Sequence, residues 1–317
     1  MTAAFGKVGV LYGGKSAERE VSLMSGAGVC EALRSRGVDA HLFDTGTRGM
    51  VELAQERFDR VFIALHGRYG EDGTLQGALE LLGIPYTGSG TMASSLAMDK
   101  IMTKRVWLEA GLPTPRYVAI ADEVQVPSAL ETIGLPMILK APHEGSTLGI
   151  VRVSVAESAL PAYREVRNYD AMVLAEQFIT GRELTVAILG SGADAHALPV
   201  IEIVAPEGNY DYEHKYFSDD TRYLCPAPIE PAIATRVADL CVRAYRALGC
   251  EGWGRADVIL DGEGRLWLLE INTSPGMTGH SLVPMAAKAI GMSYPDLCLR
   301  ILEQARCKVG GEQARPA

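Results

Sequence analysis

The sequence predicts a protein of mixed α/β and α+β class, made of three domains and beginning with a doubly wound parallel sheet. Over residues 1–98, short apolar segments alternate with segments of helical periodicity, which is typical of a parallel sheet covered by helices on both faces. Over residues 99–180, apolar segments follow one another with little helix between them, which indicates a small α+β unit with an antiparallel sheet. The chain has 317 residues, more than one hydrophobic core normally serves, so residues 181–317 are expected to form a third domain.

The N-terminal elements are bounded by glycines and by a capping residue. An apolar strand is predicted over 7–12 and ends in a pair of glycines. Ser16 is then expected to cap a helix that runs to about Ser35, because a serine hydroxyl accepts hydrogen bonds from the free N–H groups of a helix start. Gly37 ends this helix. Further elements are predicted in the same way: strands over 38–43, 60–65 and 84–86, and an amphipathic helix over 75–82.

The rest of the chain divides into closely spaced strands and then longer helices. A helix is expected over 99–110, and the strands that follow it are predicted over 137–140, 149–153, 172–178 and 183–189. A long polar segment over 207–225 and a helix over 231–248 then precede a hairpin and two C-terminal helices.

The composition is that of an ordinary globular protein and argues against several functions. Hydrophobic residues make up 48% of the chain and charged residues 22%. The net charge of −9 argues against a general binder of nucleic acid or of anionic membranes. No apolar run reaches the length of about 18 residues that a membrane span needs. The six cysteines lack C-x-x-C spacing and the first residues lack a signal-peptide core, so a reduced protein in the cytoplasm is expected.

A hairpin over residues 254–272 carries the most informative pattern. Because side chains alternate between the two faces of a strand, one face is expected to hold polar side chains only: Arg255, Asp257, Glu270 and Asn272. With a four-residue turn, Arg255 lies opposite Glu270, and Asp257 is its diagonal neighbour. Oxygen ligands of this kind suit Mg²⁺ completed by substrate phosphates, and the alternative is a surface ladder of ion pairs. The other face is expected to be apolar throughout: Ala256, Val258, Leu260, Trp267, Leu269 and Ile271.

Residues 9–16 satisfy the P-loop pattern G-x-x-x-x-G-K-[ST], but the surrounding sequence argues against a P-loop. A P-loop needs its first glycine at the end of a strand. Here the apolar run continues past Gly9, so this glycine is expected inside the strand. Only the glycine turn and the helix start after it remain as a binding element, and the carboxylate of Glu18 there favours a cationic amine over a phosphate.

Several runs of residues carry a resemblance to one enzyme family. They are 13–22, 66–74, 98–100, 144–149, 210–216 and 254–284. Together and in this order they resemble the motifs of the D-alanine–D-alanine ligases, a family of the ATP-grasp superfamily, and the resemblance extends over residues 8–305. It implies a three-domain ATP-grasp fold. It also implies an enzyme that joins two D-alanines to D-alanyl-D-alanine through an acyl phosphate, releases ADP and phosphate, and serves peptidoglycan precursor synthesis.

The cofactors implied by the resemblance are ATP and two Mg²⁺ or Mn²⁺ ions. The matching metal ligands are Asp257, Glu270 and Asn272. In the family pattern the Glu176 carboxylate and backbone groups of Gln177 and Ile179, on an edge segment, hold adenine. The full set of ATP-binding positions that match is Lys100, Lys140, Ser146, Glu176, Gln177, Ile179, Glu183 and Lys215.

The resemblance also assigns positions to the two amino acids. Glu18 pairs with the ammonium of the first D-alanine. His66 contacts the same substrate, unless it is a packed structural histidine. Arg255 and the Gly276 N–H stabilise the tetrahedral oxyanion.

The resemblance assigns the second substrate and the closure of the site to an expected helix start at Ser281 and to the polar segment over 207–225, which resembles the family's mobile loop. The carboxylate of the second D-alanine binds to Ser281 and to the N–H of Leu282, which lie at an expected helix start. Lys215 adds positive charge there. Tyr216, Ser146 and Glu18 are expected to form a hydrogen-bonded set that holds the three domains closed over the site. In the family, a tyrosine at this position accompanies D-alanine as the second substrate.

Two alternatives stay open from the sequence. One is a ligase for another acid–amine pair, such as D-alanine with D-lactate or a glutathione-synthetase-like reaction. The other is a nucleotide sensor without catalysis. Small molecules are the expected partners, nucleic acid and membranes are not expected, and the resemblance implies a homodimer.

Overall fold

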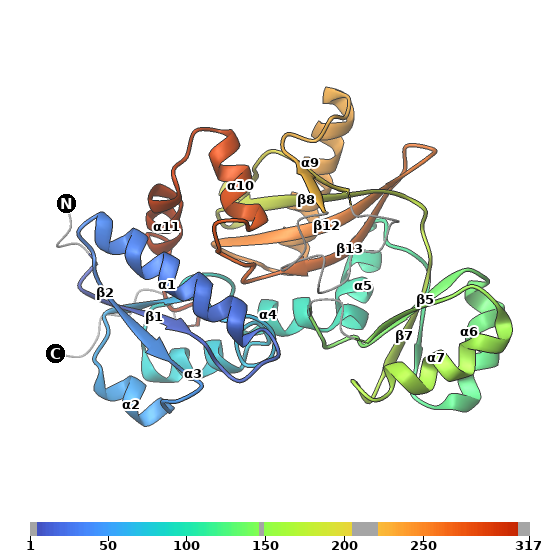
Figure 1. The fold of residues 1–317 in the computed structure, drawn as a ribbon, viewed down its shortest axis with the longest axis horizontal. Coiled ribbons are helices and arrows are strands. Elements are labelled where there is room, and N and C mark those ends of the chain that lie inside the picture. The colour runs from blue at the N-terminus through green and yellow to red at the C-terminus, as the bar shows by residue number, and fades with distance from the viewer. Residues whose placement is uncertain (1–4, 146–148, 205–220, 310–317) are drawn as a thin grey trace.

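The computed structural model describes residues 5–145, 149–204 and 221–309, which form three β-sheets with helices packed against them (Figure 1). The N-terminal and central sheets lie at opposite ends of the lower half of Figure 1, and the C-terminal sheet lies above the space between them. Two helices, α4 (Thr91–Met98) and α5 (Lys100–Glu109), run beneath that sheet and connect the lower two units. No helix in the described ranges is long and apolar enough to cross a bilayer.

The N-terminal sheet is parallel throughout, which confirms the predicted class. Its strands are β1 (Lys7–Tyr12), β2 (Asp39–Asp44) and β3 (Arg60–Ile63). They are ordered β2-β1-β3, and Tyr86 adds a parallel bridge to Val61. Successive residues of β1 serve different cores, since Val10 packs on one face and Leu11 on the other. The helices of this unit are α1 (Arg19–Ser35), α2 (Met50–Gln55) and α3 (Thr74–Leu82).

Helix α1 ends where the sequence predicts but starts later. Gly37 follows its last turn with a φ of 76°, a conformation that suits glycine. The predicted cap at Ser16 is wrong, because Glu18 occupies the N-cap position. The hydroxyl of Ser16 instead donates to the His66 carbonyl at 2.7 Å and accepts from the Glu18 N–H at 3.3 Å. Ser16 therefore ties the loop before α1 to the end of the strand region around His66.

The central sheet is antiparallel, as predicted, but it is covered by two helices that were not predicted. Its strands are β4 (Tyr117–Ile120), β5 (Met137–Lys140), β6 (Ile150–Val153) and β7 (Val173–Gln177), in the order β4-β7-β5-β6. Helices α6 (Val126–Ile133) and α7 (Ala159–Val166) pack on it, so the expectation of little helix was wrong. Each has only eight residues, and Pro127 falls in the first turn of α6, where proline is tolerated. Short 3₁₀ turns cover Glu123–Gln125, Ala156–Ser158 and Gly192–Asp194.

The C-terminal sheet is the largest and carries the predicted hairpin. Its strands are β8 (Gly181–Leu189), β9 (His196–Ala197), β10 (Ile201–Val204), β11 (Arg222–Leu224), β12 (Trp253–Asp261) and β13 (Leu266–Asn272). The order is β11-β10-β8-β12-β13, with β9 paired to β8. Helix α9 (Pro231–Ala247) covers one face, and the last helices are α10 (Leu282–Ala289) and α11 (Tyr294–Leu302).

The hairpin exists, but its predicted register is wrong. Leu260 pairs with Leu266, so the turn is one residue longer than predicted, and the pairing shifts by one more residue between Asp257 and Val258. Asp257 therefore lies opposite Glu270, and Arg255 lies opposite Asn272. This β-bulge places an extra residue on β13. The apolar face therefore contains Leu266 and Leu268, which are buried, and not Trp267 and Leu269, which are half-buried. The four polar residues still share one face.

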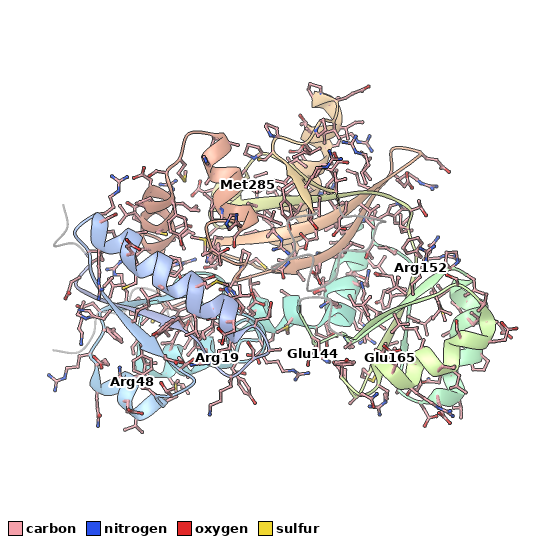
Figure 2. The ribbon with its side chains drawn as sticks, viewed as in Figure 1. Arg19, Arg48, Glu144, Arg152, Glu165 and Met285 are labelled. Atoms are coloured by element: carbon pink, nitrogen blue, oxygen red, sulfur yellow. The ribbon has the colours of Figure 1, made fainter. Side chains whose placement is uncertain are left out.

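The N-terminal and C-terminal units share one hydrophobic core, while the central unit has its own. The shared core joins β1 and α1 to residues of β8, α10 and α11, and the rings of Phe62 and Trp253 lie 6.1 Å apart within it. The central core uses only residues of 120–175. An ion pair between Arg68 and Glu144, at 2.8 Å, links the N-terminal and central units, and Figure 2 shows Glu144 between them. The boundaries after residues 98 and 180 stay predictions.

Candidate active site

The polar face of the hairpin brings the carboxylates of Asp257 and Glu270 together. Asp257 is buried, and its two oxygens accept from Arg255 Nε and Nη2 at 2.9 and 2.8 Å. The hydroxyl of Thr185, on the neighbouring β8, donates to Asp257 Oδ1 at 2.6 Å, and Asn272 Nδ2 lies 3.3 Å from Oδ2. This set holds the Asp257 side chain in one orientation toward Glu270.

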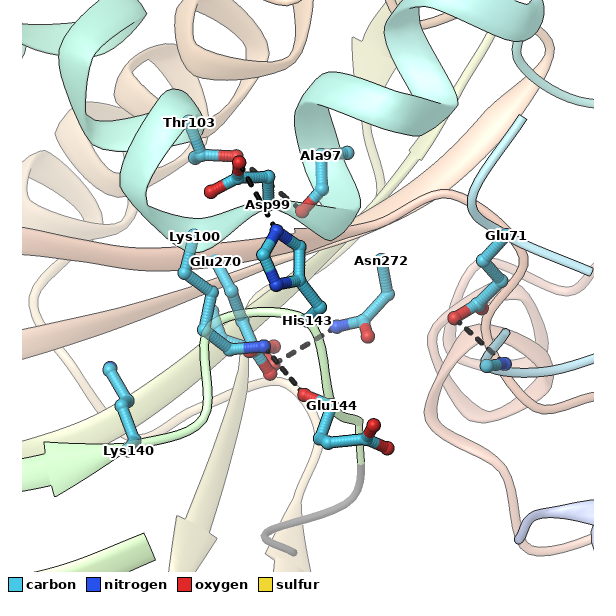
Figure 3. Close-up of polar contacts among 12 residues, drawn as sticks. Glu71, Ala97, Asp99, Lys100, Thr103, Lys140, His143, Glu144, Glu270 and Asn272 are labelled. Carbon is cyan, nitrogen blue, oxygen red and sulfur yellow. Dashed lines mark hydrogen bonds and ion pairs between the residues drawn. The ribbon is translucent and has the colours of Figure 1, made fainter. Parts of the chain in front are cut away.

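Lys100 reaches this face from the start of α5. Asp99 caps that helix by accepting from the N–H groups of Ile101 and Met102 at 2.9 and 3.0 Å. The cap fixes the first turn, and Lys100 Nζ then lies 3.3 Å from Glu270 Oε2 and donates to the Glu144 carbonyl at 2.8 Å (Figure 3). The lysine thus joins the hairpin to the loop after β5.

A small pocket opens beside this face and adds a residue to which the sequence assigned no role. Glu71 lines the pocket together with Lys100, Glu270 and Asn272. The pKa of Glu71 is raised well above its usual range, first by burial and then by the negative charge of Glu18. A carboxyl group with such a raised pKa, in a pocket, is typical of a functional site. Its place in the recognised run 66–74 was the one signal in the sequence.

Glu18 points into the same region from the N-terminal unit. It is buried, and a methyl group added to Gly67 would lie 2.7 Å from Glu18 Oε2. A methyl group on Gly145, in the loop after β5, would lie 3.0 Å from the same oxygen. The two glycines therefore give the carboxylate the room it occupies, and they bring the N-terminal and central units together around it.

His66 is buried and uses both ring nitrogens within the protein. Nδ1 lies 2.8 Å from the Ser274 carbonyl, which only accepts, so Nδ1 carries the proton. Nε2 then accepts from the hydroxyl of Ser25 at 3.1 Å, and that oxygen accepts from the Met277 N–H at 3.1 Å. Burial lowers the pKa of His66, in agreement with a neutral ring. These contacts favour the structural alternative, in which His66 positions the turn around Gly276.

That turn leads directly into α10. Ser281 is the N-cap residue of α10, and Leu282 is its first residue and is buried. The Ser281 hydroxyl accepts from the Thr278 N–H at 2.9 Å. A methyl group on Gly276 would lie 2.9 Å from Ser281 Oγ, so the two predicted substrate positions are direct neighbours.

The described residues predicted to hold the nucleotide lie on or directly after β5, β7 and β8, except for Lys100, which lies on α5. The segment that begins at Glu176 was expected at a sheet edge, and this expectation was wrong. Strand β7 lies between β4 and β5. The Glu176 carboxylate is buried and contacts Lys104 and Lys140. The Gln177 N–H already donates to the Arg116 carbonyl at 2.8 Å. Ile179 follows the end of β7, and Glu183 lies on β8 opposite Ile259.

Three predicted positions lie outside the described residues. They are Ser146, Lys215 and Tyr216.

The glycine-rich turn after β1 is not a P-loop. Gly9 is inside β1 and pairs with His41 on one side and Val61 on the other. Lys15 is exposed. Changing Lys15 to alanine is therefore expected to leave the KM for ATP within about twofold of the wild-type value. Steady-state kinetics with varied ATP test this, and a loss of about tenfold or more would restore the P-loop interpretation.

His143 holds the loop after β5 through two carboxylates. Its Nδ1 lies 2.8 Å from Asp170 Oδ2. Its Nε2 lies 3.3 Å from Asp99 Oδ2, and Figure 3 shows this second contact. The hydrogen bond to Asp99, opposed by burial and supported by Asp170, raises the pKa of His143. Because the folded state holds this proton more tightly, the stability it adds is complete below the ordinary histidine pKa of about 6.5 and is lost as pH rises through the raised value.

The His143→Gln variant tests this dependence. Urea unfolding is expected to show a wild-type advantage near roughly pH 6 that shrinks toward roughly pH 9. His196→Gln, at an exposed histidine bonded to the Asp194 carbonyl, is the matched control. A wild-type advantage that does not change with pH would contradict the assignment.

The hairpin donors fit a divalent cation. They are two carboxylates and an amide, which are hard oxygen ligands of the kind Mg²⁺ prefers. In this structure the two carboxylates pair with the guanidinium of Arg255 and the ammonium of Lys100, so a bound cation would share them with these two groups. Within the described ranges, no three His, Cys, Asp or Glu side chains converge as a metal cluster, and Asn272 adds an amide oxygen to the two carboxylates on the same face.

The three sheets and the polar hairpin face between them define an ATP-grasp fold. Residues 106–303 match the family model described as D-ala D-ala ligase C-terminus, and residues 46–89 match D-ala D-ala ligase N-terminus. The chain therefore belongs to the D-alanine–D-alanine ligase family.

Individual relatives agree over nearly the whole chain. A D-alanine–D-alanine ligase of Bordetella pertussis is 70% identical over 309 residues, which cover 98% of each protein. One of Bordetella petrii is 69% identical over 306 residues, covering 96% of this chain and 94% of the relative. The crystal structure of the enzyme named D-alanine–D-alanine ligase from Bacillus anthracis matches with a TM-score of 0.84 at 31% identity, over 94% of this chain and 97% of the other.

Proposed function

We propose that this protein joins two D-alanines to D-alanyl-D-alanine while ATP is cleaved to ADP and phosphate. The observation that carries the proposal is the hairpin face, on which Asp257 and Glu270 lie opposite each other beside Lys100. The reaction is inferred from the D-alanine–D-alanine ligase of Bordetella pertussis, to which this chain is 70% identical over 98% of its length. The product serves the synthesis of peptidoglycan precursors.

The chemistry explains why such a site is needed. A carboxylate is a poor electrophile, so an amine does not attack it in water. Transfer of the γ-phosphoryl group of ATP to the carboxylate of the first D-alanine makes an acyl phosphate. The amine of the second D-alanine then attacks, the C–N bond forms, the nitrogen gives up a proton to the phosphate or to solvent, and phosphate leaves with the C–O bond electrons.

The phosphates and the metal ions are assigned to the hairpin and to two lysines. Asp257, Glu270 and Asn272 would hold two Mg²⁺ or Mn²⁺ ions, which neutralise the transferring phosphoryl group when bound. Lys100, already 3.3 Å from Glu270 Oε2, and Lys140 add positive charge for the phosphates. Gln177, Ile179 and the other nucleotide positions are assigned by family resemblance.

The first D-alanine is assigned to the region between the N-terminal unit and the hairpin. Glu18 is buried close to Gly67 and would pair with the substrate ammonium. Arg255, half-buried on β12, and the Gly276 N–H would bind the oxyanion of the tetrahedral intermediate. The protein contacts of His66 support a positioning role for it in this site.

The second D-alanine is assigned to the start of α10. Ser281 and the N–H of Leu282 would bind its carboxylate, because backbone N–H groups at a helix start attract anions. Lys215 adds charge, and Tyr216 with Ser146 closes the site against water; this part of the proposal rests on the resemblance alone.

A homodimer in the cytoplasm is also part of the proposal, and sedimentation of the purified protein tests its assembly.

Release of phosphate tests the proposed reaction. The purified protein with Mg-ATP is expected to release phosphate with D-alanine and not with L-alanine. Equal release with both, or with neither, would contradict the proposal. A competition between D-lactate and D-alanine tests the alternative acid–amine pairs, and D-alanyl-D-alanine is the expected product. ATP binding without phosphate release in any mixture would instead indicate a nucleotide sensor.

A further inference from the structure

A buried cluster of three charged side chains contains two residues of the proposed nucleotide site, Glu176 and Lys140, and a third, Lys104, to which no role has been assigned. Glu176, on β7, contacts Lys104 of α5 and Lys140 of β5, with Lys140 Nζ 2.5 Å from Glu176 Oε2. The side chains are 4%, 0% and 9% exposed, respectively. Two ammonium groups therefore share one carboxylate, and the cluster has a net charge of +1. Burying an excess charge is costly unless another group compensates it.

The two lysines are held differently. Lys104 Nζ donates to the Thr114 hydroxyl at 2.5 Å, and this hydroxyl donates to the Leu268 carbonyl on β13 at 2.8 Å. Lys104 is thus enclosed and anchored to the hairpin strand that carries Glu270. Lys140 is the last residue of β5, it retains some exposure, and it precedes the loop that contacts Lys100 through Glu144.

The charges of this cluster support a division of roles. Burial lowers the pKa of Lys104 to about 8, although the charge of Glu176 raises it, so Lys104 is mostly protonated at neutral pH. Burial alone would raise the pKa of Glu176, but the charges of Lys104 and Lys140 outweigh burial and lower it. Glu176 therefore stays ionised and holds a fixed negative charge next to Lys140.

We infer that Lys104 is a positioning residue that serves as the permanent counter-charge of Glu176 and so leaves Lys140 free to bind the nucleotide phosphates. The inference rests on the proposed function, because it takes Lys140 as a phosphate-binding residue. Without Lys104, the cluster becomes a neutral buried pair of Glu176 and Lys140. Phosphates would then have to break that pair before Lys140 could bind them.

The Lys104→Met variant separates this role from a merely structural one. The variant leaves a neutral ion pair in place of an excess charge, so it is expected to fold. Its affinity for Mg-bound AMP-PNP, measured by titration calorimetry, is expected to fall about tenfold, while its affinity for adenosine stays within about twofold. Phosphates are the only difference between the two ligands that Lys140 would contact.

A double variant gives the sharpest test. Adding Glu176→Gln to Lys104→Met removes the charge that holds Lys140, so the ratio of AMP-PNP to adenosine affinity is expected to return most of the way to the wild-type ratio; the ratio cancels any effect of Glu176 on adenine. If the double variant has the same ratio as Lys104→Met, the inference is wrong. It is also wrong if Lys104→Met binds AMP-PNP like the wild type, or loses adenosine and AMP-PNP affinity equally.

Two further results keep the test decisive. If Lys104→Met does not fold, the Glu176→Gln variant is measured alone. Its ratio of AMP-PNP affinity to adenosine affinity is expected to equal or exceed the wild-type ratio. A lower ratio overturns the inference. A wild-type protein that binds AMP-PNP but makes no dipeptide would overturn the proposed function, while the expected Lys104 pattern in binding would still stand.

Discussion

Replacement of Glu270 by glutamine is expected to lower kcat by about a thousandfold or more, because metal-assisted charge stabilisation of a phosphoryl transfer contributes several kcal/mol. The glutamine keeps the shape of the side chain but removes the negative charge that faces Asp257 and Lys100. Phosphate release with saturating D-alanine and Mg-ATP measures the effect. Circular dichroism and thermal melting are expected to stay close to the wild type, since Glu270 is only half-buried.

Glu263→Gln is the matched control for this change. Glu263 lies in the turn of the same hairpin, where it is 73% exposed and pairs with Arg265. Its replacement is expected to leave kcat within about twofold, because exposed ion pairs contribute little. If Glu270→Gln retains wild-type kcat, the hairpin face is not the phosphoryl-transfer site.

Replacement of Arg255 by lysine is expected to lower kcat by about a hundredfold, which is typical for the loss of one well-placed oxyanion donor. Lysine keeps the charge but not the planar fork that contacts both oxygens of Asp257. Both the oxyanion contact and the orientation of Asp257 are therefore lost. Single-turnover phosphate release and dipeptide formation measure the chemical step directly.

Arg265→Lys provides the comparison for this variant. Arg265 also pairs with an aspartate of the hairpin, with Nε 2.7 Å from Asp261 Oδ2, but it lies at the exposed turn. We expect its kcat to stay within about twofold of the wild type. An Arg255→Lys enzyme as active as the Arg265→Lys enzyme would remove Arg255 from the catalytic set.

The hairpin shows how far the sequence predicts the site. Period-two alternation placed Arg255, Asp257, Glu270 and Asn272 on one face, and the structure agrees. The partner of each residue was wrong, because the turn is one residue longer than predicted and a β-bulge after Asp257 adds a second residue to β13 without any glycine or proline to mark it. Binary patterns identify faces, whereas register depends on backbone geometry that the pattern does not contain.

Other parts were not predictable because they depend on tertiary contacts. Serine commonly caps helices, but the hydroxyl of Ser16 instead donates a hydrogen bond to the carbonyl of His66, which lies 50 positions along the chain. Helices α6 and α7 are different, because their buried residues follow helical spacing over two turns each, so the signal was in the sequence and the prediction of little helix overlooked it: Val126, Ala129 and Ile133 in α6, and Ala159, Ala162, Tyr163 and Val166 in α7. Lys104 looks like a surface lysine in sequence, and only the packing of α5 against Thr114 and Glu176 buries it.

Isotope transfer tests the central claim most directly. D-alanine labelled with ¹⁸O in both carboxylate oxygens is incubated with the protein and Mg-ATP, and phosphate and dipeptide are analysed by mass spectrometry. If the acyl phosphate forms, each phosphate released carries one ¹⁸O from the first D-alanine, and the new amide retains the other. Unlabelled phosphate, or the absence of D-alanyl-D-alanine, would contradict the account.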